Sequence, residues 1–80
     1  MAKRYELTSV VWHEEGGWVS KCPELGVASC GDDPEDALHN LVEAVELYLE
    51  NAKLLGLLPD LKPVLEARDR LAGRLKVAVP

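Results

Sequence analysis

Residues 33–56, DPEDALHNLVEAVELYLENAKLLG, decide the fold because they contain the start, the apolar face and the end of one helix. Asp33 stands where an N-cap residue belongs, since its carboxylate can accept a hydrogen bond from the first turn. Pro34 suits the first helical position, where a backbone N–H has no helical partner in any case. Gly56 suits the left-handed residue that ends many helices. The stretch therefore predicts a helix that begins at Asp33 and ends near Leu55.

The apolar side chains of this segment advance by threes and fours, which places them on one face of a helix. They are Leu38, Leu41, Val42, Val45, Tyr48, Leu49 and Ala52. The opposite stripe is polar and consists of Glu35, His39, Glu43, Glu46, Glu50 and Lys53. A helix of this kind packs its apolar stripe against a second layer. We therefore expect the apolar stripe on a sheet and the glutamates in solvent.

Two leucines do not fit this arrangement. Leu47 and Leu54 are seven residues apart and project on the polar side of the helix, nearly in line. A single exposed leucine is ordinary, but two in line indicate a second contact surface. Either residues 57–72 fold back and cover them, or they contact another subunit or a partner.

Three short strands are predicted before the helix. Residues 5–12 and 18–22 are rich in β-branched and aromatic side chains, and residues 27–31 form a third short run. Glycines at positions 16 and 17 suit the positive φ angles of a tight turn, so the first two strands should form an antiparallel hairpin. The sequence leaves open whether the loop of this hairpin holds two or four residues.

The last quarter of the chain predicts a second helix and a further strand. Pro63 suits the start of a short helix through Ala72, with Gly73 at its end. Residues 74–79 alternate polar and apolar side chains, and we expect them to form a strand beside one of the first three. The complete pattern is β-β-β-α-α-β, an α+β fold in which an antiparallel sheet of three to four strands packs against one long helix. Residues 1–80 are expected to form a single domain.

Composition and charge limit the function. The chain has 80 residues and a net charge of −5, which argues against nucleic acid as its main partner. Residues 32–60 carry eight acids and one base, whereas residues 61–80 carry five bases and two acids. This clustering indicates either a solvated helix face or an acidic surface for a basic partner. No stretch has the length and apolar character of a membrane span, and no signal peptide is expected, so we expect a cytoplasmic protein.

Little in the sequence points to catalysis. For Cys22 and Cys30 we expect two reduced thiols, with a bridge between neighbouring strands or metal binding as alternatives. His13 lies beside the hairpin turn and His39 on the polar stripe, and neither accompanies a nucleophile motif. The glycine pair lacks the pattern of a phosphate-binding loop. We expect no enzyme activity, no bound metal and no cofactor.

Several segments resemble, in the same order, the N-terminal domain of HicB-type antitoxins. They are Tyr5-Glu6-Leu7, Trp12, Gly16-Gly17-Trp18, Cys22-Pro23-Glu24-Leu25-Gly26, Gly31-Asp32, Glu35-Asp36-Ala37-Leu38 and Glu43-Ala44-Val45-Glu46-Leu47-Tyr48-Leu49-Glu50. The resemblance covers residues 5–50 and implies a small α+β sandwich related to a truncated ribonuclease H layout. It also implies that the chain binds a small, basic, HicA-like mRNA-cleaving toxin and covers its active site, and that copies of the chain self-associate as a dimer or tetramer.

The chain also departs from that family's pattern. The loop at Leu25 and Gly26 lacks the proline that usually precedes the glycine. Asp33 and Pro34 replace the usual threonine and its neighbour, a change that keeps a helix cap. Residues 56–80 are too short for a helix-turn-helix, so direct DNA binding is not expected.

Two hypotheses from different classes follow. In the first, the chain is an antitoxin-like inhibitor of a basic ribonuclease, and Glu43, Glu46 and Glu50 steer that partner. In the second, the chain is a self-assembling structural module without a toxin, a dimer or tetramer, with the sheet edge or Leu47 and Leu54 at its interface. These glutamates and leucines are the predicted partner-binding residues.

Overall fold

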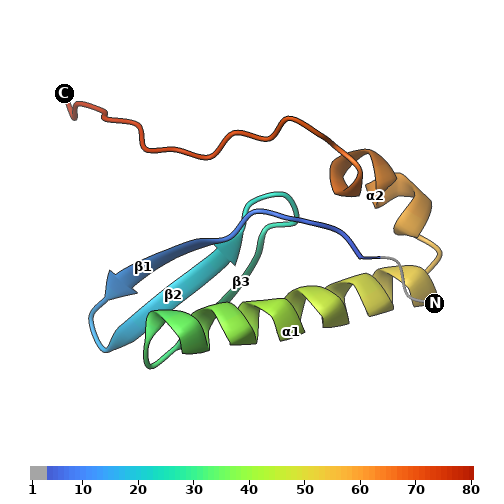
Figure 1. The fold of residues 1–80 in the computed structure, drawn as a ribbon, viewed down its shortest axis with the longest axis horizontal. Helices are drawn as coiled ribbons and strands as arrows, with labels where there is room; N and C mark the ends of the chain where they lie inside the picture. The colour runs from blue at the N-terminus through green and yellow to red at the C-terminus, as the bar shows by residue number, and fades with distance from the viewer. Residues whose placement is uncertain (1–3) are drawn as a thin grey trace.

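The computed structural model describes residues 4–80 as a three-stranded antiparallel sheet with two helices (Figure 1). The elements are β1 (Val10–Glu14), β2 (Gly17–Cys22), β3 (Val27–Gly31), α1 (Pro34–Leu54) and α2 (Leu58–Leu65). The strands lie in the order β1-β2-β3, and α1 packs on one face of the sheet. The predicted α+β fold, with one long helix and a second short helix, is confirmed.

The hairpin between β1 and β2 has a two-residue loop. Glu14 pairs with Gly17, which leaves Glu15 and Gly16 in the turn. Gly16 has a φ of +87°, a value that glycine adopts without strain. Of the two loop lengths that the sequence allows, the shorter one is therefore correct.

The first strand begins later than predicted. β1 starts at Val10 and not at Tyr5, and residues 4–9 run on without belonging to the sheet. They have no neighbouring strand, because Val10 already pairs with Lys21 and β2 ends one residue later, at Cys22. The backbone N–H of Thr8 instead donates a hydrogen bond to the carboxylate of Glu24 at 2.9 Å. We call residues 4–9 the N-terminal segment.

Both ends of α1 are capped as predicted. Asp33 accepts a hydrogen bond from the backbone N–H of Asp36 at 2.7 Å, and Asp36 accepts one from the N–H of Asp32 at 2.9 Å. At the other end Gly56 has a φ of +72°, the left-handed conformation of a helix C-terminus. Local signals within residues 33–56 therefore fix both limits of the helix.

The sheet and α1 are in close contact at Gly31, the last residue of β3. A Cβ atom at that position would lie 2.4 Å from the backbone nitrogen of Ala37. Ser20 on β2 is fully buried, and its Oγ donates a hydrogen bond to the Ala37 carbonyl at 2.8 Å. One glycine and one buried hydroxyl therefore hold the first turn of α1 on the sheet.

The buried core is small. Its apolar members are Cys22, Ala37, Leu41, Ala52 and Leu65. The apolar stripe of α1 is only partly covered, because Leu38, Val42 and Tyr48 are 41, 50 and 40% exposed. Of the three strands, β1 touches the helix least, so one side of the stripe extends past the sheet. The apolar stripe lies on the sheet as predicted, but one edge of it stays uncovered.

The second helix lies earlier in the chain than predicted. It is α2 and not residues 63–72, so Pro63 lies inside the helix and not at its start. The helix ends at Leu65 because the chain turns back there. Arg70 then donates a hydrogen bond to the Leu65 carbonyl at 3.3 Å, a group that a longer helix would use itself.

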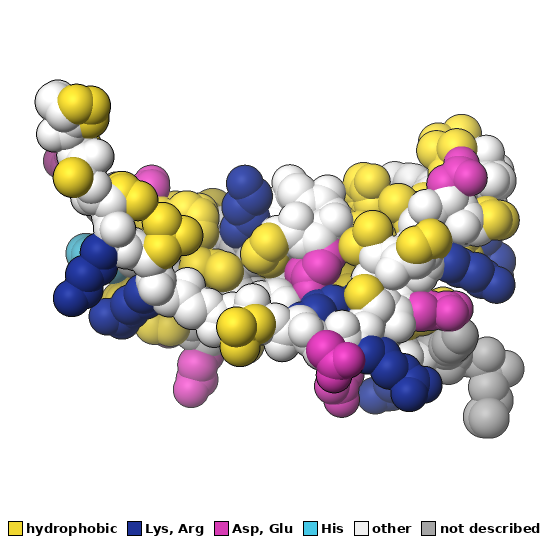
Figure 2. Space-filling model, turned by 90° about the horizontal axis from the view of Figure 1, so that it is seen from above, with side chains coloured by type: hydrophobic (Ala, Val, Ile, Leu, Met, Phe, Trp, Pro, Cys, Tyr) yellow, Lys and Arg dark blue, Asp and Glu magenta, His cyan; other side chains and the backbone are white. Residues whose placement is uncertain are grey.

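The predicted fourth strand is not formed. Residues 74–79 are part of a stretch, residues 66–80, that has neither helix nor strand. Leu75, Val77 and Val79 are 80, 77 and 90% exposed. A strand needs a neighbour for its backbone groups and side chains, and within residues 4–80 no strand pairs with this one. Figure 2, seen from the side on which this end of the chain lies, shows apolar side chains remaining at the surface.

Candidate functional site

The glutamates that were predicted to steer a partner are all exposed on α1, but they do not form one cluster. Glu43 and Glu50 lie on the side of the helix turned away from the sheet. The carboxylate of Glu43 is 3.2 Å from Nε2 of His39, in an exposed contact of a kind that adds little stability. Glu46 lies nearer to the apolar stripe of α1 and lines the groove beside it.

Leu47 and Leu54 share the outward side with Glu43 and Glu50. The leucines are 58 and 78% exposed, so the alternative in which residues 57–72 cover them is wrong. They lie about 10 Å apart along the helix axis, two turns of the same ridge. We call Glu43, Leu47, Glu50 and Leu54 the outer face of α1. Apolar side chains bordered by charged ones are the usual anatomy of a protein interface.

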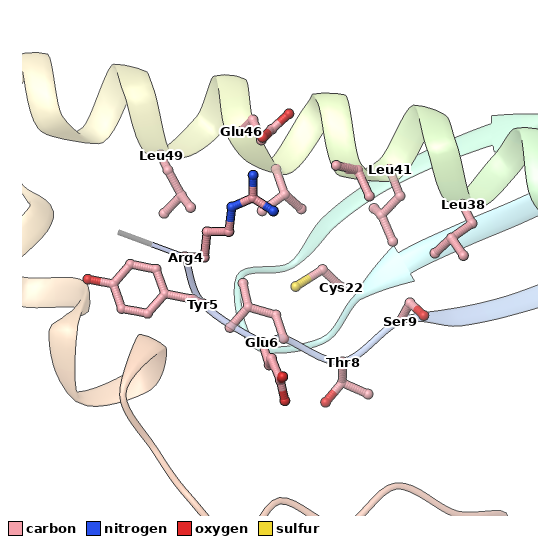
Figure 3. A pocket seen from close by; sticks show the side chains of 13 residues that line it. Arg4, Tyr5, Glu6, Thr8, Ser9, Cys22, Leu38, Leu41, Glu46 and Leu49 are labelled. Atoms are coloured by element: carbon pink, nitrogen blue, oxygen red, sulfur yellow. The ribbon is translucent and has the colours of Figure 1, made fainter. Parts of the chain in front are cut away.

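A groove of about 750 Å³ lies between α1 and the N-terminal segment (Figure 3). Leu38, Val42 and Leu49 line it on the helix side, and Cys22 lies at its base. Residues 4–9 form the facing wall, and the Arg4 side chain extends from this wall toward α1 (Figure 3). The groove was not predicted, because the sequence pattern placed the N-terminal segment in the sheet and the leucines in the core.

Glu24 connects the N-terminal segment to the chain that follows α2. Its carboxylate accepts hydrogen bonds from the N–H and the Oγ1 of Thr8 at 2.9 and 2.7 Å, and Nε of Arg70 lies 3.3 Å from it. Arg70 also donates to the carbonyl of Glu6. Sequence analysis missed this cluster because its members lie far apart in the chain and form no motif.

The environment of Glu24 keeps its carboxyl group charged. Partial burial acts to raise the pKa of Glu24, but hydrogen bonds from Thr8 and from backbone N–H groups outweigh it. The pKa of Glu24 is therefore held below its usual value. At neutral pH the charged carboxylate accepts the hydrogen bonds of Thr8 and forms an ion pair with Arg70.

The two cysteines are free thiols, so the alternative of a bridge between strands is wrong. Cys22 is buried on the side of the sheet that faces α1, and Cys30 is exposed. Cys30 pairs with Val19, which places both on the opposite side of the sheet from Ser20. Burial is the main cause that raises the pKa of the Cys22 thiol, and Glu24 adds to it.

Residues 4–80 hold neither a metal-binding cluster nor a membrane-spanning helix. Among residues 4–80, His, Cys, Asp and Glu side chains form no group of three or more that could hold a metal ion. Within the same residues, neither helix combines the length and the apolar character that crossing a membrane requires. The described chain has two surfaces with uncovered apolar side chains, the outer face of α1 and the groove.

Comparison with curated proteins finds a similarity to the UPF0150 protein ssr1765 of Synechocystis sp.. The two sequences are 47% identical over 49 residues, which is 59% of this chain and 62% of that protein. This chain therefore matches less than two thirds of the length of its curated relative. No model of a known protein family matches the chain, and no solved structure matches it.

Proposed function

We propose that the outer face of α1 binds and inhibits a small, basic, HicA-like mRNA-cleaving toxin. The observation that carries this proposal is the exposure of Leu47 and Leu54 beside Glu43 and Glu50. The leucines supply apolar area that a partner can cover, and the carboxylates supply charge of the sign that attracts a basic surface.

Charge gives a physical reason for inhibition. An enzyme that cuts mRNA needs a basic surface to hold the phosphates of its substrate. An acidic surface can occupy that site in place of RNA. Because residues 32–60 carry eight acids and one base, long-range attraction would also speed the encounter.

The sequence resemblance supports the same assignment. Residues 5–50 resemble HicB-type antitoxins, and these residues contain most of the outer face. The similarity to a UPF0150 protein shows that 49 residues of this chain have a counterpart in a protein of Synechocystis sp.. We place the complex in the cytoplasm, where mRNA is translated, and we assign the chain no direct contact with DNA.

The test is binding to the small basic protein encoded by the adjacent reading frame, measured by stopped-flow kinetics together with a growth assay. Glu43→Lys with Glu50→Lys should slow association by about tenfold and reduce its salt dependence. Glu15→Lys with Asp60→Lys makes the same change of net charge away from the outer face and serves as the control. Equal losses in both double variants would reject the outer face as the binding site.

Glu46 separates the two surfaces in the same assay. It borders the groove, so Glu46→Lys should slow association less than Glu43→Lys does. A larger loss at Glu46 would move the toxin site to the groove. Circular dichroism of each variant verifies that the helix is intact.

The exposed leucines also favour a second candidate function, self-assembly without a toxin. In that case Leu47→Lys with Leu54→Lys should lower the mass of the protein in sedimentation equilibrium. An unchanged mass would reject the outer face as an interface between copies. Toxin binding by the wild-type chain decides between the two functions, because only the first one requires it.

A further inference from the structure

The surface of this chain is too large for a compact monomer of its mass. Its accessible surface is 6773 Å², whereas a folded monomer of 8.8 kDa exposes about 4,800 Å². The radius of gyration is 14.4 Å, compared with about 12 Å for a compact domain of 80 residues. The excess is about 2,000 Å² per chain, or about 4,000 Å² for two chains, which lies in the range that permanent homodimers bury in total.

Part of this excess belongs to residues 71–80, which we call the tail. Leu75, Val77 and Val79 alternate with Arg74 and Lys76, so an extended tail has one apolar side. All three apolar side chains are exposed. The tail is therefore a strand-forming segment whose apolar side is uncovered.

The groove matches the tail in length and spacing. From Leu38 to Leu49 the helix wall extends about 17 Å, and residues 74–79 extended also span about 17 Å. Alternate residues of a strand are about 6.6 Å apart, close to the 6 Å rise between helix positions such as Leu38 and Val42. Leu75, Val77 and Val79 can therefore lie along the apolar wall of α1 in step with it.

Charge favours the same pairing. Glu46 lines the groove, and Glu35 precedes it by eleven residues on almost the same side of α1. Arg74 and Lys76 have long side chains that can reach such a rim while their neighbours contact the groove. The groove lining also contains Arg4, so the charge attraction rests on the two glutamates of α1 at the rim.

The tail cannot easily enter the groove of its own chain. Arg70, just before the tail, is bound to the Glu6 carbonyl and lies beside Glu24. In Figure 3 the N-terminal segment lies between the groove and the chain that follows α2. The tail therefore starts on the far side of the N-terminal segment, and its own groove would require crossing that segment.

We propose that residues 74–79 occupy the groove of a second copy of this chain, and that two copies exchange their tails in a two-fold dimer. An exchange of this kind uses the same contact twice and closes the assembly. It covers the apolar residues of both the tail and the groove. It leaves the outer face of α1 free, so it is independent of the proposed toxin binding.

The first experiment measures self-association of the full chain by sedimentation equilibrium over a concentration series. The wild-type protein should reach twice its mass of 8.8 kDa. Val77→Asp places a carboxylate in the apolar groove and should weaken the dimer by at least about tenfold. Ala78→Asp adds the same charge on the other side of the strand and should leave the dimer almost unchanged.

A mixing experiment shows whether the contact is between copies. Val42→Asp damages the groove and leaves the tail intact, whereas Val77→Asp does the reverse. An equimolar mixture retains one intact tail and groove in each mixed pair, so it should associate more strongly than either variant alone. Circular dichroism must show native helix content in both, since Val42 and Val77 are exposed in the single chain.

Three outcomes would overturn the proposal. The full chain could remain a monomer at every concentration. It could form dimers that neither Val42→Asp nor Val77→Asp weakens, which would place the interface elsewhere. The mixture could associate no better than either variant alone. If the tail amides were also protected from exchange in the monomer, the tail would dock on its own chain.

Discussion

Two regions of this chain have sequence patterns that predict regular structure, and the two outcomes are opposite. In residues 27–56 a strand and a capped helix form where their patterns predict them. In residues 74–79 an alternating pattern that suits a strand gives an unpaired chain. A helix closes its hydrogen bonds within itself, whereas a strand needs a neighbour. A local pattern is therefore realised only where the surface that completes it is present.

The largest expected effect is the difference between adding one methyl group to a glycine of the first region and adding one near the second. Gly31→Ala should lower the free energy of unfolding by about 3 kcal/mol, because its Cβ would lie 2.4 Å from the backbone of Ala37. Gly73→Ala should have almost no effect, since nothing lies within 4 Å of a Cβ there. Urea unfolding of both variants measures the difference. Similar stabilities would mean that the contact between β3 and α1 is looser than the structure shows.

The same contrast applies to leucines. Leu41 is 3% exposed, and Leu41→Ala should lower the free energy of unfolding by about 2 kcal/mol. The expected loss is at the low end of the range because Leu41 also lines the groove, where water can enter the space. Leu75→Ala should leave thermal unfolding of the monomer unchanged. A loss at Leu75 in dilute protein would show that the tail contacts its own chain.

The helix cap should have a smaller effect. Asp33→Ala removes the acceptor of the Asp36 N–H and should lower the free energy of unfolding by about 1 kcal/mol. Asp32→Ala is the matched control, because Asp32 contributes its backbone N–H and keeps it. If Asp33→Ala and Asp32→Ala changed the helix content and the free energy of unfolding equally, net charge and not the cap would stabilise this end of α1.

The smallest effect concerns the link between the two regions at Glu24. Its pKa in the folded state lies below the usual 4.5, so its contribution to stability is present above that value and is lost as the pH falls through the lower folded pKa. Glu24→Gln should remove this part of the acid dependence of unfolding. It should also speed proteolysis after Arg70, which loses a charged neighbour. An unchanged acid profile would exclude Glu24 as its source.

The sequence was sufficient for those features that depend on neighbours in the chain. The cap at Asp33, the left-handed Gly56 and the limits of β3 follow from residue types within a few positions. The exposure of Leu47 and Leu54 could be suspected from the helical wheel, although the choice between a covered and an open ridge needed the position of α2.

Features that depend on distant residues could not be predicted. The groove exists because α1 lies over β2 and β3 and away from β1, a consequence of the close contact at Gly31. The end of α2 depends on Arg70, and the position of the N-terminal segment depends on Glu24. Each of these contacts joins segments that lie far apart in the chain, and the residues of one segment do not indicate that it will contact the other.

The buried hydroxyl of Ser20 has a consequence for the opposite side of the molecule. Its hydrogen bond to the Ala37 carbonyl sets the rotation of α1 about its own axis. A slip of one residue would turn the helix by about 100° and leave the hydroxyl unsatisfied at a cost of about 1–3 kcal/mol. A single atom inside the protein thus selects which side chains α1 displays to the outside.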